Sequence, residues 1–253
     1  MNYGKKRTRK REHELASKGT MIRKKFNVIF CKALLICFFA VVIVGGCSAF
    51  GVISGIIASA PSIEDIDATP TGYLTTVLDN QGNQTATLVA SGSNRKYVTI
   101  NEIPINLQHA FVAIEDERFY DHNGIDLQGI LRAGLKGVAS GFHFSEGAST
   151  ITQQLVKNNV LSEQWESENT GDISKIEKME RQVQRKIQEM YIAVELEKKV
   201  DDKDWILENY LNSINLGNNT LGVQAAAERY FGKDVSDLTL SECAVIAGIT
   251  KNP

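Results

Sequence analysis

The sequence predicts a mainly α-helical domain that follows one transmembrane helix, with a small β element between the two. Three observations support this fold class. Residues 33–63 contain no charged side chain. After Pro104, apolar residues recur at spacings of three and four, which is typical of helices with one buried face. Between these regions, two short β-favouring runs flank a turn-forming segment.

The N-terminal region has the pattern of a membrane anchor. The uncharged run 33–63 exceeds the roughly 20 apolar residues that cross a bilayer. Residues 1–25 hold ten Lys/Arg against two Glu, and positive charge stays on the cytoplasmic side. We therefore expect a single-pass protein of the cell membrane. It would have a cytoplasmic basic tail at 1–25, a transmembrane helix at 26–60 and an extracytoplasmic body. The apolar run is too long for a cleaved signal peptide.

One feature of the anchor suggests lipidation of a cysteine instead of a retained helix. Val44–Cys47 resembles a lipoprotein site, but hydrophobic residues continue after Cys47, where a lipidated cysteine normally begins a polar tether. We therefore expect a retained helix. Only Cys243 lies in the body, so no disulfide is expected there, and the histidines have no zinc-type spacing with cysteines.

The charge of the body argues against nucleic-acid binding. Residues 61–253 hold 17 Lys/Arg against 28 Asp/Glu, and an acidic surface repels phosphate backbones. The basic tail lies next to the membrane segment, where anionic lipid explains it.

The β element and linker are expected at 61–100. The β-favouring runs Tyr73–Leu78 and Thr85–Val89 flank Asp79–Asn83, which predicts a hairpin. The helical domain is expected at 101–253. A helix follows Pro104, and further helices are expected near 173–199, 204–212, 222–231 and 241–249. The long helix has an apolar stripe at Ile176, Met179, Val183, Ile187, Met190 and Val194. Residues 161–171 are polar and aperiodic, which predicts a mobile loop.

The first chemistry-bearing cluster is Glu115–Gly124. Glu115 follows Phe111 by four residues and adjoins Ile114, so it lies at the edge of an apolar helix face. A carboxylate held there is partly removed from water, which suits a general base. An acidic, solvated helix end explains the same residues.

The second cluster is Gly147–Gln154 with Lys157. Small hydroxyl residues before a helix predict an N-cap, and free N–H groups at a helix start attract anions. Gln153 and Lys157 are four residues apart, so they would place a donor and a cation beside one anion. An ordinary capped helix is the alternative.

The third cluster is Arg185–Glu189, whose end residues are neighbours on a helix. Glu189 lies away from the main apolar stripe, so it faces a cleft or forms a surface ion pair. Taken together, two carboxylates flanking an anion site suit the transfer of a sugar from a diphosphate.

These residues also resemble a known family, the peptidoglycan glycosyltransferases of class A penicillin-binding proteins and their monofunctional relatives. Five segments resemble the family's motifs in order: EDERFYDHNGID at 115–126, GASTITQQLVKN at 147–158, RKIQE at 185–189, KDWILENYLN at 203–212 and AVIAGITKNP at 244–253.

The resemblance implies a lysozyme-like glycosyltransferase domain that inverts the anomeric centre and polymerises lipid II into β-1,4-linked strands, releasing undecaprenyl diphosphate. Glu115 matches the general base and Glu189 the second essential carboxylate. Matches to substrate and diphosphate positions are Ser149, Gln153, Gln154, Lys157, Arg185 and Lys186. Matches to supporting positions are Asp116, Phe119, His122, Gly124, Tyr210 and Asn212.

The family also implies the partners. They are lipid II, the growing strand, the membrane, and cell-wall synthesis or division proteins. No cofactor is required, and a divalent cation at the diphosphate stays open. The family often carries aromatic residues after the fourth motif, where this chain has Asn215, Leu216 and Leu221. Because Pro253 closes the fifth motif, we expect the end of the domain and a transpeptidase domain to be missing.

Ser93–Lys96 fits a Ser-x-x-Lys pattern without its usual partners, so penicillin binding is not expected. Two other functions stay open at this stage. One is a lysozyme-like enzyme that cleaves glycan strands, and the other is a non-catalytic membrane scaffold.

Overall fold

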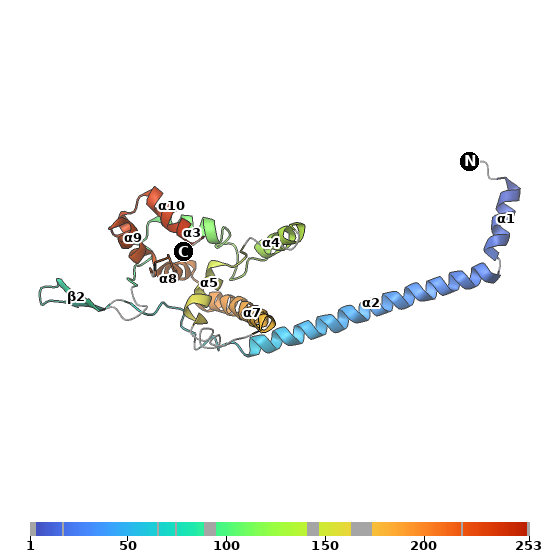
Figure 1. The fold of residues 1–253 in the computed structure, drawn as a ribbon, viewed down its shortest axis with the longest axis horizontal. Helices are drawn as coiled ribbons and strands as arrows, with labels where there is room; N and C mark the ends of the chain where they lie inside the picture. The colour runs from blue at the N-terminus through green and yellow to red at the C-terminus, as the bar shows by residue number, and fades with distance from the viewer. Residues whose placement is uncertain are drawn as a thin grey trace. The chain divides into compact units, whose positions relative to one another are not determined.

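The structure, a computed structural model, describes most of the chain. The described residues are 4–16, 18–64, 66–73, 75–88, 95–140, 147–162, 174–218 and 220–251. They divide into two compact units, residues 1–58 and 59–253 (Figure 1). Most of the expected mobile loop, together with Val89, Ser93 and Pro253, lies outside the described residues.

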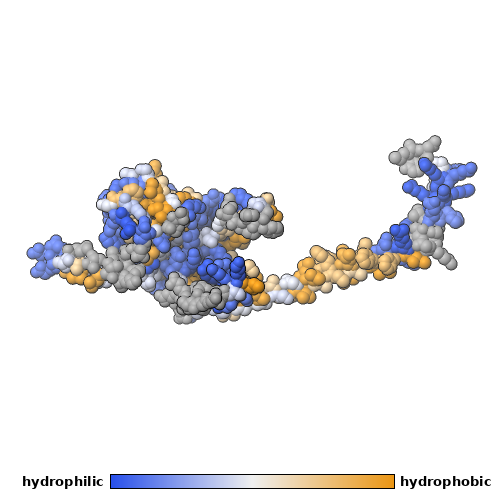
Figure 2. Space-filling view, in the orientation of Figure 1, coloured by the Kyte–Doolittle hydropathy of each residue, from blue (hydrophilic) through white to orange (hydrophobic). Residues whose placement is uncertain are grey.

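The first unit consists of two helices, α1 (Lys5–Ala16) and α2 (Lys18–Ala58). Helix α2 contains a 37-residue apolar span, Ile22–Ala58, that is long enough to cross a bilayer and is not buried against other residues of the protein. Figure 2 shows this hydrophobic span and the hydrophilic surface of α1. The predicted apolar helix is therefore present, and it suggests a membrane-anchored protein.

The predicted hairpin is confirmed. Strands β1 (Thr75–Leu78) and β2 (Gln84–Leu88) pair antiparallel, with Thr75 opposite Leu88. In the turn, the Asp79 carboxylate accepts hydrogen bonds from the backbone N–H groups of Gln81 and Asn83, both at 2.8 Å. Gly82 has φ +83°, a conformation that favours glycine.

The second unit is mainly helical, as predicted. Its helices are α3 (Ile105–Glu115), α4 (Leu127–Ala139), α5 (Ile151–Asn159), α7 (Lys175–Val200), α8 (Lys203–Ser213), α9 (Val223–Phe231), the 3₁₀ turn η1 (Val235–Asp237) and α10 (Leu240–Ile249). Helix α5 packs against α7 and α8, and α10 packs against α3. Phe111 of α3 and Tyr210 of α8 are fully buried and meet edge to face at 6.1 Å between ring centroids.

The apolar stripe predicted for α7 is wrong in its first half. Ile176, Met179 and Val183 are 74%, 61% and 54% exposed. The buried side chains of α7 are instead Gln188, Glu189, Ile192, Ala193, Leu196 and Glu197. The face that meets α5 and the core carries polar groups with partners of their own, so apolar periodicity did not identify it.

Helix α4 also leaves apolar side chains in solvent. Leu127, Leu131, Leu135 and Val138 are all exposed, and their spacings of four and three place them on one face. Single exposed apolar residues are ordinary, but a row of four on one helix face is a feature of surfaces that contact apolar partners.

Candidate active site

Glu115 is the last residue of α3, and the chain leaves the helix at Asp116 with φ −158°. Its side chain is half-buried, and one carboxylate oxygen accepts a hydrogen bond from Gln154 Nε2 at 2.8 Å. The Gln154 carbonyl oxygen in turn lies 3.5 Å from the Tyr210 hydroxyl. Glu115 is therefore held at a helix end by α5, with its charge turned towards a pocket.

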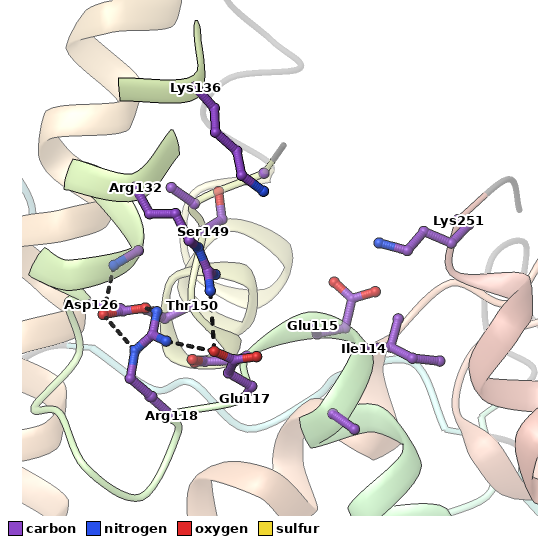
Figure 3. A pocket seen from close by; sticks show the side chains of 15 residues that line it. Ile114, Glu115, Glu117, Arg118, Asp126, Arg132, Lys136, Ser149, Thr150 and Lys251 are labelled. Carbon is purple, nitrogen blue, oxygen red and sulfur yellow. Dashed lines mark hydrogen bonds and ion pairs between the residues drawn. The ribbon is translucent and has the colours of Figure 1, made fainter. Parts of the chain in front are cut away.

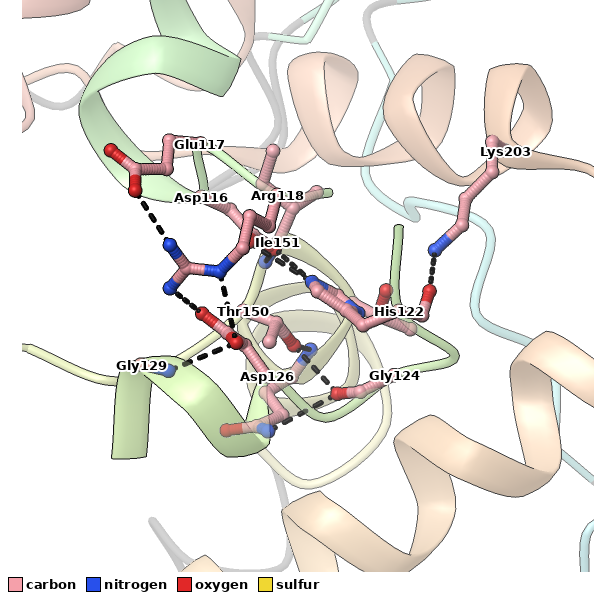
Figure 4. Close-up of polar contacts among 12 residues, drawn as sticks. Asp116, Glu117, Arg118, His122, Gly124, Asp126, Gly129, Thr150, Ile151 and Lys203 are labelled. Atoms are coloured by element: carbon pink, nitrogen blue, oxygen red, sulfur yellow. Dashed lines mark hydrogen bonds and ion pairs between the residues drawn. The ribbon is translucent and has the colours of Figure 1, made fainter. Parts of the chain in front are cut away.

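Asp116 joins the first motif to the start of α5. Its buried carboxylate accepts a hydrogen bond from the Ile151 backbone N–H at 3.0 Å and faces His122 Nε2 at 3.0 Å (Figure 4). The His122 carbonyl accepts from Lys203 Nζ at 2.6 Å. A carboxylate at a helix N-terminus also complements the helix dipole. Asp116 thus fixes where α5 begins relative to Glu115.

Gly124 allows a close approach of two backbones. It has φ +84°, and a Cβ there would lie 2.7 Å from the carbonyl carbon of Ala193 in α7. Its carbonyl oxygen accepts hydrogen bonds from the Thr150 hydroxyl at 2.8 Å and from Gln153 Nε2 at 3.2 Å. Thr150 also caps α5, as the hydroxyl-rich sequence predicted, by accepting the Gln153 N–H.

Gln153 and Lys157 both line a pocket that Glu115 borders. Gln153 is 1% exposed, and its amide is occupied by the Gly124 carbonyl and Lys186. Lys157 is exposed at the pocket. Internal hydrogen bonds therefore hold Gln153 in place, and the placement of a donor and a cation beside one anion stays a prediction.

Lys186 connects α7 to the start of the second motif. Its ammonium donates to Ser149 Oγ at 2.6 Å and to Gln153 Oε1 at 2.8 Å, and it lies 3.2 Å from Glu189 Oε2. Arg185 Nε lies 3.3 Å from the other oxygen of Glu189, which confirms the predicted contact. Glu189 is only 3% exposed, so this is no surface ion pair: two cations compensate a buried negative charge.

The two predicted carboxylates share one pocket of about 270 Å³. Three different helices contribute to it: α3 brings Glu115, α5 brings Lys157 and α7 brings Glu189. The complete lining is Ile114, Glu115, Gly147, Ser149, Gln153, Gln154, Lys157, Glu189 and Lys251. The convergence of the three clusters that sequence analysis singled out is therefore present in the structure.

A second pocket of about 350 Å³ adjoins the first and also borders Glu115 (Figure 3). Sequence analysis missed its cations, Arg118, Arg132, Lys136 and Lys251. The spacing of four between Arg132 and Lys136 is a helical signal, but no helix had been predicted there. Lys251 belongs to the fifth motif, which had been used only as part of the resemblance.

Ion pairs connect several of the side chains that line the second pocket (Figures 3 and 4). Arg118 pairs with Asp126, the N-cap of α4, and with Glu117 at 2.6 Å. Arg132 pairs with the same Glu117 oxygen at 3.1 Å. The hydrogen bond from Arg118 holds the pKa of Asp126 below its ordinary value. The first motif and α4 are therefore bound together by charge.

Tyr210 and Asn212, the matches to the fourth motif, lie beneath the site. Burial raises the pKa of the Tyr210 hydroxyl well above its ordinary value, and the charges of Glu115 and Asp116 raise it further. Asn212 exchanges two hydrogen bonds with the backbone of Val98, at 3.0 and 2.8 Å. Both residues attach the site to the core.

In the described part of the chain, no three His, Cys, Asp or Glu side chains come together as a candidate metal-ligand set.

Two carboxylates and several cations line adjoining pockets, an arrangement that suits group transfer from an anionic substrate. A family model described as Transglycosylase matches residues 81–253. This chain belongs to the transglycosylase family, and it is a glycosyltransferase.

Relatives named penicillin-binding protein 1A agree with this. That of Clostridium perfringens (strain 13 / Type A) is 42% identical over 97% of this chain and 34% of its own length. That of Clostridium tetani is 36% identical over 100% of this chain and 28% of its own. That of Escherichia coli (strain K12) is 48% identical over 62% of this chain and 16% of its own. The chain thus spans about a third or less of the relatives it matches.

Proposed function

We propose that this chain polymerises lipid II into β-1,4-linked glycan strands in bacterial cell wall synthesis. The observation that carries the proposal is the meeting of Glu115 and Glu189 at one pocket beside Lys157. The family match and the names of the relatives support a role in peptidoglycan synthesis.

In the proposed reaction, the Glu115 carboxylate accepts the proton of the acceptor sugar's 4-hydroxyl. The freed oxygen attacks the anomeric carbon of the donor sugar from the face opposite the diphosphate. The new C–O bond forms as the bond to the diphosphate breaks, and undecaprenyl diphosphate leaves with the electron pair. The anomeric centre is inverted.

Lys157 and the two cations paired with Glu189 are suited to binding the departing diphosphate. Lys157 is exposed in the pocket and supplies a positive charge. Glu189 lines the same pocket and pairs with Arg185 and Lys186, so it holds both cations in fixed positions next to it. Preorganised charges stabilise developing negative charge more effectively than mobile ones do. We assign Glu189 this positioning role.

The two pockets suit the two sugar substrates of a polymerase. Both border Glu115, so a donor on one side and an acceptor on the other would meet at the base. The apolar span of α2 and the exposed apolar face of α4 support work on a lipid-linked substrate at a membrane. We propose a single-pass anchor with a cytoplasmic N-terminus.

The test compares two substrates. The full chain is incubated with lipid II and, separately, with purified glycan strands. We expect lipid II to be consumed and polymer to appear. Shortening of strands without consumption of lipid II would assign the lysozyme-like cleavage function. No reaction with either substrate would favour the non-catalytic membrane scaffold.

The Glu115→Gln variant tests the base. Glutamine keeps the size of the side chain and can still contact Gln154, but it does not accept a proton. We expect polymerisation to fall by about 10²–10⁴-fold with an unchanged melting temperature. Glu180→Gln, an exposed position on α7, is the matched control and should retain full activity. Near-wild-type rates in the Glu115→Gln variant would remove Glu115 as the base.

A further inference from the structure

The segment that follows the anchor is attached to the body at several points. Residues 59–64 and 66–68, which we call the juxtamembrane strut, continue the chain directly after α2. Ile66 and Ala68 are only 8% and 2% exposed and belong to the core of the second unit, and Ile63 packs against that core. The strut is therefore part of the body and is not a free tether.

Lys199, in the last turn of α7, binds the middle of the strut. Its ammonium donates to the backbone carbonyls of Ile63 at 2.8 Å, Ile66 at 3.3 Å and Glu64 at 3.5 Å. The Ile66 N–H closes the same turn by donating to the Ile63 carbonyl at 3.4 Å. Hydrogen bonds from a charged donor are stronger than neutral ones. One exposed side chain of α7 thus binds three carbonyls of the strut.

Two further side chains bind the ends of the strut, and both come from helices that carry the candidate active site. Gln188 Nε2 donates to Ser59 Oγ at 3.2 Å, and Asn159 Nδ2 donates to the Ala68 carbonyl at 2.8 Å. Gln188 directly precedes Glu189 in α7, and Asn159 is the last residue of α5. The strut is therefore connected to two of the helices that supply the pocket lining.

A free linker would behave differently. A flexible chain of about ten residues has a root-mean-square end-to-end distance of roughly 17 Å, so it would let the pockets move by about that distance relative to the end of the anchor. A docked strut removes this freedom. For a substrate that stays in the membrane, the linker sets how often the pocket and the substrate meet.

We propose that Lys199 is a positioning residue, which keeps the strut docked on α7 so that the pockets stay within reach of a substrate anchored in the same membrane. The proposal rests on the proposed function, because it requires a lipid-linked substrate. Lys199 lines neither pocket, so it acts through the strut and not by contact with the substrate.

A comparison of bilayers with detergent tests this role. The full chain and lipid II are placed together in vesicles or in detergent micelles, and initial rates are measured for wild type, Lys199→Met and Lys199→Arg. We expect Lys199→Met to lower the rate about fivefold in vesicles and less than about twofold in detergent, where no extended membrane surface fixes the substrate. Lys199→Arg keeps a charged donor and should recover most of the rate in vesicles.

A spin label reports docking of the strut without any enzyme activity. Ser62, an exposed residue of the strut, is replaced by cysteine and labelled with a nitroxide, after Cys31, Cys37 and Cys47 have been changed to serine. We expect a slow-motion spectrum when Lys199 is present. The Lys199→Met variant should add a component with faster motion.

Lys198→Met is the matched control, because Lys198 is the neighbouring lysine of α7, is also exposed and pairs with Glu195 at 2.7 Å. It should behave as wild type in every measurement. Equal losses of rate in vesicles and in detergent for Lys199→Met would overturn the positioning role, and so would unchanged rates or an unchanged spectrum. A wild-type protein that makes no polymer in either medium would instead reject the proposed function, and the spectrum would then decide whether Lys199 docks the strut.

Discussion

Neighbouring carboxylates at the end of α3 have opposite surroundings. Glu115 is half-buried, has one hydrogen bond from Gln154 and faces the pockets. Asp116 is buried, accepts the Ile151 N–H and faces His122. The break in the helix between them directs one side chain to the pockets and the other to the core. Asp116 therefore acts by holding the first two motifs together, which keeps Glu115 close to α5.

Gly124 and Gly134 provide a matched pair for testing the close approach of the first motif to α7. Gly124→Ala puts a methyl group 2.7 Å from the Ala193 backbone at φ +84°, whereas Gly134→Ala meets nothing within 4 Å on α4. We expect the first to lower the melting temperature by about 5–10 °C and the second to leave it unchanged or raise it by about 2–4 °C. Thermal unfolding of the full chain in detergent measures both. Equal melting temperatures for the two variants would show that the contact with α7 is not tight.

At the scale of elements, sequence patterns predicted the helices whose apolar face meets the core. Helices α3, α8, α9 and α10 are such cases, and each lies within a few residues of its expected range. Helix α4 was not predicted. Its apolar residues point outwards, and its three glycines, Gly129, Gly134 and Gly137, are typical of loops.

The site was predictable only in part, for a related reason. Local spacing indicated that Arg185 and Glu189 are neighbours, and they are. The meeting of Glu189 with Glu115 depends on how α3, α5 and α7 pack, which no short-range pattern encodes. The family resemblance supplied that expectation. Neither source singled out Lys251, because lining both pockets is a property of the folded chain and not of any local pattern.

The start of α10 predicts a dependence of stability on pH. The Glu242 carboxylate accepts hydrogen bonds from the Thr239 N–H and hydroxyl, both at 2.7 Å, and pairs with Lys233 at 3.0 Å. The backbone bond first, then the hydroxyl and Lys233, lower the pKa of Glu242 to about 2. A lowered pKa stabilises the fold above the ordinary pKa of a glutamate, and this contribution is lost as pH falls towards 2.

Comparing Glu242→Gln with wild type tests this dependence. At pH 7 we expect the variant to melt at a lower temperature, and the difference should shrink between about pH 4.5 and pH 2. Melting temperatures of the full chain across this range provide the measurement. The exposed Glu180→Gln variant is the control and should follow wild type at every pH. A constant difference for Glu242→Gln would contradict the assignment.

At the scale of the whole molecule, the distribution of charge is asymmetric. Residues 1–25 hold ten Lys/Arg against two Glu, whereas residues 61–253 hold 17 Lys/Arg against 28 Asp/Glu. The apolar span Ile22–Ala58 separates these two regions along the chain. Translocation of an anchored chain leaves the basic flank in the cytoplasm.

Labelling of single cysteines tests this orientation. The three cysteines of α2, Cys31, Cys37 and Cys47, are replaced by serine, while buried Cys243 is kept. Lys5→Cys and Asn80→Cys then place one exposed thiol on each side of α2. We expect a membrane-impermeant maleimide, added to intact cells stripped of their outer layers, to label Asn80→Cys and to reach Lys5→Cys only after permeabilisation. The parent without either cysteine measures the background. Labelling of Lys5→Cys in sealed cells would place the basic tail outside, and the body would then lie on the side opposite a substrate presented at the outer leaflet.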